Sequence, residues 1–275
     1  MTDRATAFVP GHVTGFFSVH RDDDPTRAGS TGAGLTLSEG VTVAVEPAEE
    51  RAVYLNDASI EVGAVDRVLD ALAATARMTA ETDLPLGSGF GVSGGLALGT
   101  ALATNAAFDR GLSENELVTV AHGAEVQAGT GLGDVVAQAR GGIPIRLEPG
   151  APGHGKLDGI PRRARVEFVS LGSLDTGEVI GGDTGALDRA GREALSRVVK
   201  DPTLSSFAFA SRRFAREAGL LTDRVRETVE AVSAADGEAS MAMLGETVFA
   251  LGSGLTDAGY DPTVRSTHSA GAYVK

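Results

Sequence analysis

The sequence predicts an α+β fold in two domains. Strand-like and helix-like segments are mixed along the chain, without the regular strand–helix alternation that a doubly wound sheet requires. A short polar stretch rich in Pro and Gly interrupts the chain near its middle, and the segments that follow are mostly helical in pattern. The 275 residues suffice for one large or two modest domains with a real hydrophobic core. We therefore expect domains at residues 1–160 and 161–275.

The N-terminal elements are predicted from alternating apolar residues. Ala7–Val9 is strand-like, and the valines of VTVAV at 41–45 alternate as they do in a half-buried strand. Residues 51–63 form a second alternating run, with a turn at Asn56-Asp57. Residues 22–34 are rich in Asp, Gly, Pro, Ser and Thr, so we expect a loop there.

Helices are predicted in the middle of the chain from apolar stripes and from their end signals. Ser113 and Glu116 fit a capping box, and Gly129 and Gly131 end the helix that this box begins. A weak strand signal at 78–82 precedes the glycine-dense segment described below. The predicted helices of this region are 65–75, 96–108 and 114–128.

The second half of the chain begins with strand-like sequence at 143–149. Residues 149–159 are the best candidate for a linker, because they are short, polar and rich in Pro and Gly. A strong strand signal follows at 163–172. The later segments are predicted to be helical at 183–200, 206–218, 222–233 and 239–251.

The composition excludes several classes of function. Cysteine is absent, which rules out disulfides, thiolate nucleophiles and cysteine-bound metals. The formal net charge of −13 repels nucleic acid and anionic lipid, so we expect neither as a partner. No apolar run approaches the roughly 18–20 residues of a membrane helix, and no signal-peptide pattern is evident, so a cytoplasmic protein is expected. Arginine carries nearly all the positive charge, and this acidic, lysine-poor composition is typical of a salt-adapted organism.

The segment PLGSGFGVSGG at 85–95 is dense in glycine and runs into a predicted helix. Such a cluster indicates either a tight turn that binds nothing or a loop whose backbone amides hold a phosphate. Residues 89–94 match G-x-G-x-x-G, but the residues before them are polar and include Pro85, unlike the apolar strand of a dinucleotide-binding fold. No G-x-x-x-x-G-K-[ST] motif is present. We favour the phosphate-binding interpretation over the empty turn.

The same segment resembles the phosphate loop of the GHMP kinase superfamily, usually written P-x-x-x-G-L-G-S-S-A-A. Phe90 stands in place of the leucine, Val92 in place of the first serine, and Ser93 keeps the second, metal-facing serine. The resemblance implies a ribosomal-protein-like α/β N-terminal domain, a ferredoxin-like C-terminal domain, and ATP and Mg²⁺ as cofactors. The implied nucleotide-binding residues are Pro85, Gly87, Ser88, Gly89, Phe90, Gly91, Val92, Ser93, Gly94 and Gly95.

Glu125 is the candidate metal-binding carboxylate. Its spacing from Val118 and Ala121 places it on the apolar face of the predicted 114–128 helix. A glutamate that points at a core is costly unless it is paired or metal-bound, whereas a solvated glutamate at the rim is the alternative. The resemblance implies that Glu125, together with Ser93, binds magnesium.

Asp134 is the candidate catalytic residue, in the segment GTGLGDVVAQ. Turn chemistry alone is a sufficient reason for an aspartate in a glycine-rich loop. The family's G-x-x-D-x-x-A pattern is nevertheless matched by Gly131, Asp134 and Ala137. The resemblance implies that Asp134 takes the proton of the acceptor hydroxyl, or orients that hydroxyl.

Residues 10–20, PGHVTGFFSVH, resemble the superfamily's N-terminal motif facing the phosphoryl acceptor, with His12 in place of the usual Lys or Arg. The alternative for His12 and His20 is a strand-end turn with surface histidines. Together with GSTGAGLTLSEGV, GTGLGDVVAQARGG and SMAMLGETVFALG, this segment resembles the archaeal pantoate kinase branch, which uses ATP and magnesium to phosphorylate the primary hydroxyl of pantoate on the route to coenzyme A.

Pantoate carries a carboxylate, so an acceptor-binding cation is expected. Arg146 suits this role by its position, although an exposed arginine at a strand end is the alternative. The acceptor-binding residues that the resemblance implies are His12, Ser18, His20, His122 and Arg146.

Other functions stay open at this point. One is a GHMP kinase for homoserine, mevalonate or shikimate, and another is a non-catalytic nucleotide-binding regulator of the same fold. A third is a dinucleotide-dependent dehydrogenase. The superfamily's C-terminal glycine motif survives only as a remnant in STHSAGAYV. Members of the superfamily are often dimers, so a homodimer is expected.

Overall fold

Two long antiparallel strands, β1 (Ala5–His20) and β2 (Gly29–Pro47), form the centre of the fold. The computed structural model describes residues 4–173 and 182–275. The two strands pair along their whole length, with irregular register next to Pro10 and again next to Thr14. The valines predicted to alternate at 41–45 are fully buried, so that strand is confirmed.

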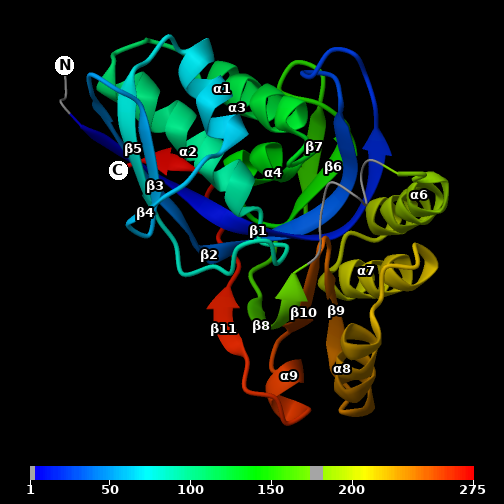
Figure 1. Cartoon of the computed structure of the whole chain (residues 1–275). Helices are drawn as coiled ribbons and strands as arrows, with labels where there is room; N and C mark the ends of the chain where they lie inside the picture. The colour runs from blue at the N-terminus through cyan, green and yellow to red at the C-terminus, as the bar shows by residue number, and fades with distance from the viewer. Residues whose placement is uncertain (1–3, 174–181) are drawn as a thin grey trace.

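Within the described residues, eight strands form the larger sheet, and helices α1 to α4 cover one of its faces (Figure 1). The order along the sheet is β12-β1-β2-β5-β3-β4, while β6 pairs with β2 and β7 pairs with β6. The other strands are β3 (Ala52–Leu55), β4 (Ala58–Ser59), β5 (Ala76–Glu81), β6 (Pro144–Glu148), β7 (Lys156–Gly159) and β12 (Tyr273–Val274). The helices are α1 (Gly63–Ala71), α2 (Val92–Ala107), α3 (Glu114–Ala128) and α4 (Asp134–Arg140).

Helix α2 lies at the centre of this layer and is buried along nearly its whole length. Its small residues allow it to approach the sheet closely. A Cβ atom at Gly95 would lie 2.9 Å from Val41 Cγ2, and one at Gly99 would lie 2.5 Å from Val43 Cγ2. Because real Cβ atoms do not approach other atoms so closely, these glycines set the distance between helix and sheet. The N-terminus of α2 is thereby held over β1 and β2.

A second, antiparallel sheet of order β11-β8-β10-β9 lies beside the larger one, within the part of the chain that is described (Figure 1). Its strands are β8 (Arg165–Ser173), β9 (Glu238–Ala242), β10 (Gly245–Leu251) and β11 (Thr263–Ser266). The accompanying helices are α6 (Gly185–Lys200), α7 (Leu204–Glu217), α8 (Asp223–Ala234) and α9 (Gly254–Asp257). The mixed sheets and helices confirm the expected α+β class and two-part arrangement.

Aromatic rings join the two parts. Phe17 of β1 lies 5.8 Å from Phe214 of α7, measured between ring centroids. Phe90, in the loop before α2, lies 4.7 Å from Phe168 of β8. Aromatic pairs at these separations add to the free energy of apolar burial. The glycine-dense loop therefore rests on the second sheet as well as leading into α2.

The predicted helix at 239–251 is wrong, because this segment forms strands β9 and β10. Most of its residues are buried, so its apolar residues show neither the period of a helix nor that of a half-exposed strand. The two strands are joined by a turn in which Leu244 has a φ of 67°. The other three helices predicted after residue 183 are confirmed in type as α6, α7 and α8.

Two predicted loops are also partly strand. Residues 29–34 belong to β2, where Ser30 and Thr31 pair with Val19 and Ser18 of β1. In the expected linker, residues 156–159 form β7, so the chain crosses to the second sheet between Gly159 and Arg165. The predicted capping box at Ser113 and Glu116 is confirmed at the start of α3.

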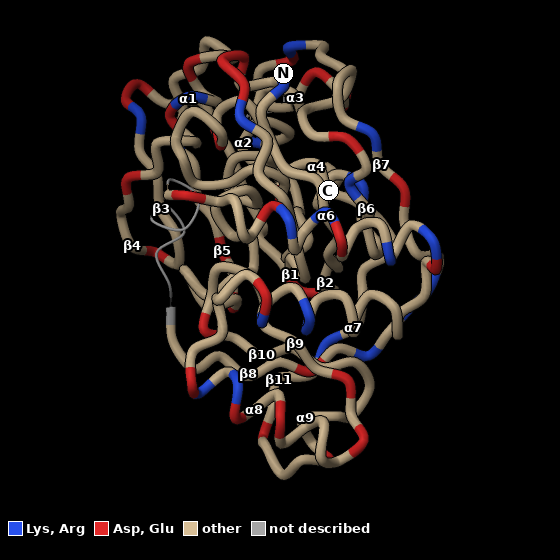
Figure 2. The backbone as a smooth tube through the Cα atoms, turned by 90° about the vertical axis from the view of Figure 1, so that its right-hand side faces the viewer, with Lys and Arg blue, Asp and Glu red and all other residues tan. Residues whose placement is uncertain are grey.

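Acidic residues are scattered along the backbone of both parts of the molecule in the view of Figure 2, rather than gathered in one segment. No helix in residues 4–173 and 182–275 has the length and apolar character needed to cross a membrane.

We expect Glu167→Ala to lower the free energy of unfolding by about 2–4 kcal/mol. The Glu167 side chain is fully buried and accepts hydrogen bonds from the backbone N–H groups of Leu255 and Thr256, each at 3.0 Å, and from the Thr256 hydroxyl at 2.7 Å. Removing this carboxylate leaves the buried N–H group of Leu255 without a partner at the start of α9. Urea unfolding measures the loss, with the exposed Glu61→Ala as control. Equal stability of the two variants would contradict this role.

Candidate active site

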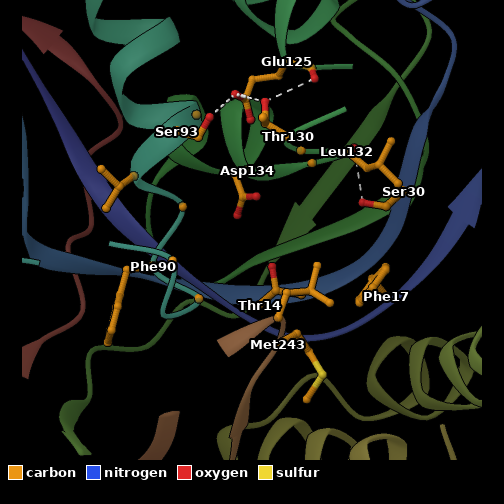
Figure 3. Close-up of a pocket in the computed structure, with 18 of the residues that line it drawn as sticks. Thr14, Phe17, Ser30, Phe90, Ser93, Glu125, Thr130, Leu132, Asp134 and Met243 are labelled. Carbon is orange, nitrogen blue, oxygen red and sulfur yellow. Dashed lines mark hydrogen bonds between the residues drawn. The ribbon is translucent and has the colours of Figure 1, made fainter. Parts of the chain in front are cut away.

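The loop before α2 leaves the helix N-terminus open to a pocket (Figure 3). Gly87, Gly89 and Gly91 have φ values of 67°, 86° and 63°, which L side chains rarely adopt. Gly91 is the N-cap of α2, and no side chain of the described chain caps it. The amides of Val92, Ser93 and Gly94 therefore have no helical partner and lie at the pocket wall. This arrangement favours an anion.

Most of the residues expected to bind the nucleotide line this pocket. These are Pro85, Gly87, Gly89, Phe90, Gly91, Val92, Ser93 and Gly94. The other two have different contacts. Ser88 is buried and its hydroxyl donates a hydrogen bond to the Leu86 carbonyl at 3.3 Å, while Gly95 packs against Val41 of β2.

Asp134 begins α4 and faces the α2 N-terminus across the pocket (Figure 3). A Cβ atom at Gly91 would lie 3.1 Å from Asp134 Oδ1, so glycine at this position avoids a tight contact with the carboxylate. Burial alone would raise the pKa of Asp134, but the hydrogen bond from His12 and the charge of Arg146 hold this pKa below its ordinary value. Asp134 is therefore ionised at neutral pH and able to accept a proton.

Glu125 is only 2% exposed, which excludes the solvated-rim alternative. Its Oε1 accepts hydrogen bonds from the hydroxyls of Ser93, at 2.5 Å, and Thr130, at 2.7 Å (Figure 3). Burial raises the pKa of Glu125 to about 7, and the nearby Asp134 charge adds to this rise, while the two hydroxyls oppose it.

Hydroxyl and carboxylate oxygens are the ligands that Mg²⁺ prefers, and a cation would relieve the repulsion between the two acids. The residues present therefore fit a magnesium ion. Across the described part of the chain, no group of three or more His, Asp or Glu side chains forms a metal site. A magnesium ion here therefore needs further oxygen ligands that do not belong to the protein.

Arg146 of β6 lines the pocket and is 2% exposed, which excludes the alternative of an exposed strand-end arginine. Its Nε and Nη1 groups have no hydrogen-bond partner among the described residues. Burial lowers the pKa of Arg146 to about 10, and the Asp134 charge opposes this change, so the guanidinium is charged at neutral pH. A buried cation with free N–H groups suits a carboxylate ligand.

The four remaining acceptor candidates contact other protein groups. His12 is fully buried, which excludes the surface-histidine alternative, and its Nδ1 lies 2.7 Å from Asp134 Oδ1. The Ser18 hydroxyl donates to the Asp188 carbonyl at 3.1 Å, and His20 Nε2 lies 3.2 Å from the Thr31 hydroxyl. His122 Nε2 donates to the Ala28 carbonyl at 2.8 Å, because a carbonyl only accepts.

Sequence reasoning missed several lining residues. Thr130, Leu132 and Ser30 also line the pocket. They were not predicted, because the glycines of their segments indicate a role for the backbone rather than for these side chains. Met243 and Leu244 come from the turn between β9 and β10, which the mistaken helix at 239–251 hid.

Comparison with known proteins shows which family the chain is similar to. A family model described as the GHMP kinases N terminal domain matches residues 59–142. The pantoate kinase of Thermococcus kodakarensis is 36% identical over 261 residues, covering 89% of this chain and 86% of that protein. The pantoate kinase of Methanocaldococcus jannaschii is 33% identical, covering 89% and 91%. A solved structure described as a phosphotransferase related to the CoA biosynthesis pathway has a TM-score of 0.88 at 32% identity, covering 99% of this chain and 98% of that one.

The fold, the open N-terminus of α2 and the two facing acids define a small-molecule kinase of the GHMP class. Within that class, the chain belongs to the pantoate kinase family.

We expect Glu125→Gln to change how the stability of the ligand-free protein depends on pH. The pKa of Glu125 is about 7 in the folded protein against 4.5 as an unperturbed group. Folding therefore disfavours the ionised form, and the wild type loses stability as pH rises from 4.5 to 7, by roughly 3 kcal/mol relative to the variant. Denaturant unfolding across this range measures the difference. Glu114→Gln, at the exposed start of the same helix, should follow the wild type, and parallel curves for Glu125→Gln would refute the raised pKa.

Proposed function

We propose that this protein transfers the γ-phosphoryl group of ATP to the primary hydroxyl of pantoate, forming 4-phosphopantoate on the route to coenzyme A. The observation that carries the proposal is the buried Arg146 guanidinium, whose unpaired N–H groups share a pocket with Asp134 and the open amides of α2. An alcohol that bears a carboxylate suits this combination. The 36% identity with the pantoate kinase of Thermococcus kodakarensis supports pantoate in particular.

The nucleotide phosphates are placed at the α2 N-terminus. Val92, Ser93 and Gly94 line the pocket at the uncapped start of α2, where the free amides and the positive end of the helix dipole favour the triphosphate. Phosphate binding by backbone groups suits a pocket wall without lysine. This arrangement holds the γ-phosphorus in place, which is the main requirement of phosphoryl transfer.

Ser93 and Glu125 are the proposed protein ligands of Mg²⁺. When bound, the ion neutralises charge on the β- and γ-phosphate oxygens. Glu125 takes part in its ionised form, and the hydrogen bond from Thr130 to the Glu125 carboxylate holds that side chain toward Ser93.

Asp134 and Arg146 are the proposed acceptor residues. Arg146 holds the pantoate carboxylate through its free N–H groups, which fixes the orientation of the acceptor. Asp134 accepts the proton of the primary hydroxyl as the hydroxyl oxygen attacks the γ-phosphorus. Its lowered pKa keeps it ionised for this purpose at neutral pH.

We expect Asp134→Asn to reduce kcat by about 10²–10⁴-fold while the protein still binds nucleotide, because the variant lacks only the proton acceptor. A coupled assay for ADP release gives kcat, and calorimetry with a non-hydrolysable ATP analogue gives the affinity. A variant with near-wild-type turnover would show that Asp134 is not the base. ATP binding by the wild type without turnover of any acceptor would instead indicate a nucleotide-binding regulator.

We expect Arg146→Met to raise KM for pantoate by about 10–100-fold, with KM for ATP nearly unchanged, because a charge-assisted hydrogen bond contributes about 1.5–3 kcal/mol. Arg67→Met, on the exposed face of α1, is the matched control and should behave as wild type. Pantoate, homoserine, mevalonate and shikimate are compared as acceptors. Preference for an acceptor other than pantoate would overturn the assignment of the substrate.

A further inference from the structure

His12 makes two contacts that join separate parts of the active site. Its side-chain Nδ1 lies 2.7 Å from Oδ1 of Asp134. Its backbone N–H donates to the carbonyl of Phe90, in the loop before α2, at 3.0 Å. One residue of β1 is therefore bonded both to the proposed base and to the loop proposed to hold the nucleotide phosphates.

The surroundings of the ring fix its protonation state. Ionised Asp134 only accepts hydrogen bonds, so Nδ1 carries a proton and donates it. Nε2 is buried and has no partner among the described residues. A second proton there would be an unpaired buried donor on a buried cation, which is costly. The neutral tautomer with its proton on Nδ1 is therefore the stable form.

Other groups around the ring agree with a neutral His12. Burial lowers the pKa of His12, and the charge of Arg146 on β6 lowers it further, whereas Asp134 on α4 raises it. The Thr14 hydroxyl lies 3.5 Å from Nδ1. A Cβ atom at position 34 would collide with Nε2, so Gly34 of β2 makes room for the ring.

We propose that His12 is a positioning residue for Asp134 and does not contact the substrate: its Nδ1–H group holds Oδ1, which leaves Oδ2 to take the proton of the acceptor hydroxyl. This inference rests on the proposed function for its catalytic consequence. A Cβ atom at Gly131 would lie 3.6 Å from Oδ2, so this oxygen points toward the Glu125 side of the pocket. In the transfer, the hydroxyl proton moves to Oδ2, the hydroxyl oxygen bonds to the γ-phosphorus, and the bond from that phosphorus to ADP breaks.

A neutral donor orients the base without pairing it with a full positive charge. A lysine or arginine at this place would stabilise the carboxylate more strongly and make it a weaker proton acceptor. His12 therefore fixes the orientation of the Asp134 carboxylate and leaves it a stronger proton acceptor than a lysine or arginine would. Because the same residue bonds the Phe90 carbonyl, the base also keeps a fixed position relative to the loop.

The kinetic test compares His12→Asn with His12→Gln. The asparagine amide nitrogen takes the place of Nδ1, and the glutamine nitrogen takes the place of Nε2. We expect His12→Asn to keep kcat within about tenfold of wild type and His12→Gln to lose about 100-fold, with KM for pantoate and ATP within about threefold in both. Wild-type kcat in His12→Gln would overturn the proposal. A rise in KM for pantoate with kcat intact would do the same, because it would make His12 a substrate contact.

The pH profile gives a readout that a purely structural role would not move. The hydrogen bond from His12 lowers the pKa of Asp134, so its removal raises that pKa. The acidic limb of kcat/KM in His12→Gln should therefore move to higher pH. An unmoved limb would contradict the contact between the two side chains.

Nitrogen-15 NMR of the wild type tests the contact without a measurement of activity. The protein has five histidines, and loss of one signal in His12→Asn assigns His12. We expect the Nδ1-protonated neutral form from pH 6 to 8. An imidazolium at pH 7, or protonation on Nε2, would overturn the proposal. If the wild type does not phosphorylate pantoate, the proposed function fails, while this spectrum still tests the bond from His12 to Asp134.

Discussion

The contact between the N-termini of α2 and α4 is the constraint on which the site depends. The two helices meet at distances that leave no room for side chains, since a Cβ atom at Gly94 would lie 3.1 Å from Asp134 Cβ and 2.9 Å from Gln138 Oε1. Gln138 fixes the contact by donating hydrogen bonds to the carbonyls of Pro10 and Gly91, both at 2.9 Å. Glycines supply the space, and one buried amide sets the geometry. The base and the phosphate-binding amides therefore belong to a single rigid unit.

Electrostatics inside the pocket differs from that of the surface. The chain carries a net charge of −13, yet the pocket wall offers backbone amides and the buried cation of Arg146. Its two carboxyl groups are moved in opposite directions: burial raises the pKa of Glu125, while the hydrogen bond from His12 holds that of Asp134 low. Two acids with separated pKa values suit different tasks, one as a cation ligand and one as a base. The environment of each carboxyl group, rather than its chemical type, decides its task.

Much of this site could be predicted from the sequence because its parts are local. Gly91, Ser93, Glu125, Asp134 and Arg146 all carry their signals in short stretches, and the structure places them around one pocket. The contact between His12 and Asp134 could not be predicted from the sequence, because the two side chains meet only when β1 packs against α4. The turn between β9 and β10 could not be predicted either, because most residues of 239–251 are buried and the turn itself lacks the polar residues typical of turns. Met243, which lies in this turn, was therefore not predicted to line the pocket. Motifs within a short stretch can be recognised from one sequence, whereas contacts between residues far apart in the sequence can be found only from the structure.

The short strand β12 pairs with the beginning of the outer edge of β1. Val274 of β12 pairs with Ala7 of β1, and the N–H group of Lys275 donates to the Thr6 carbonyl at 2.8 Å. Without β12, the unpaired backbone groups of β1 would form an open edge, which attracts other chains. The residues that protect this edge lie far along the sequence from β1, so the edge strand of the larger sheet depends on a distant segment for its outer hydrogen bonds. Loss of β12 would therefore leave the backbone of β1 at Ala7 and Phe8 free to pair with a second chain.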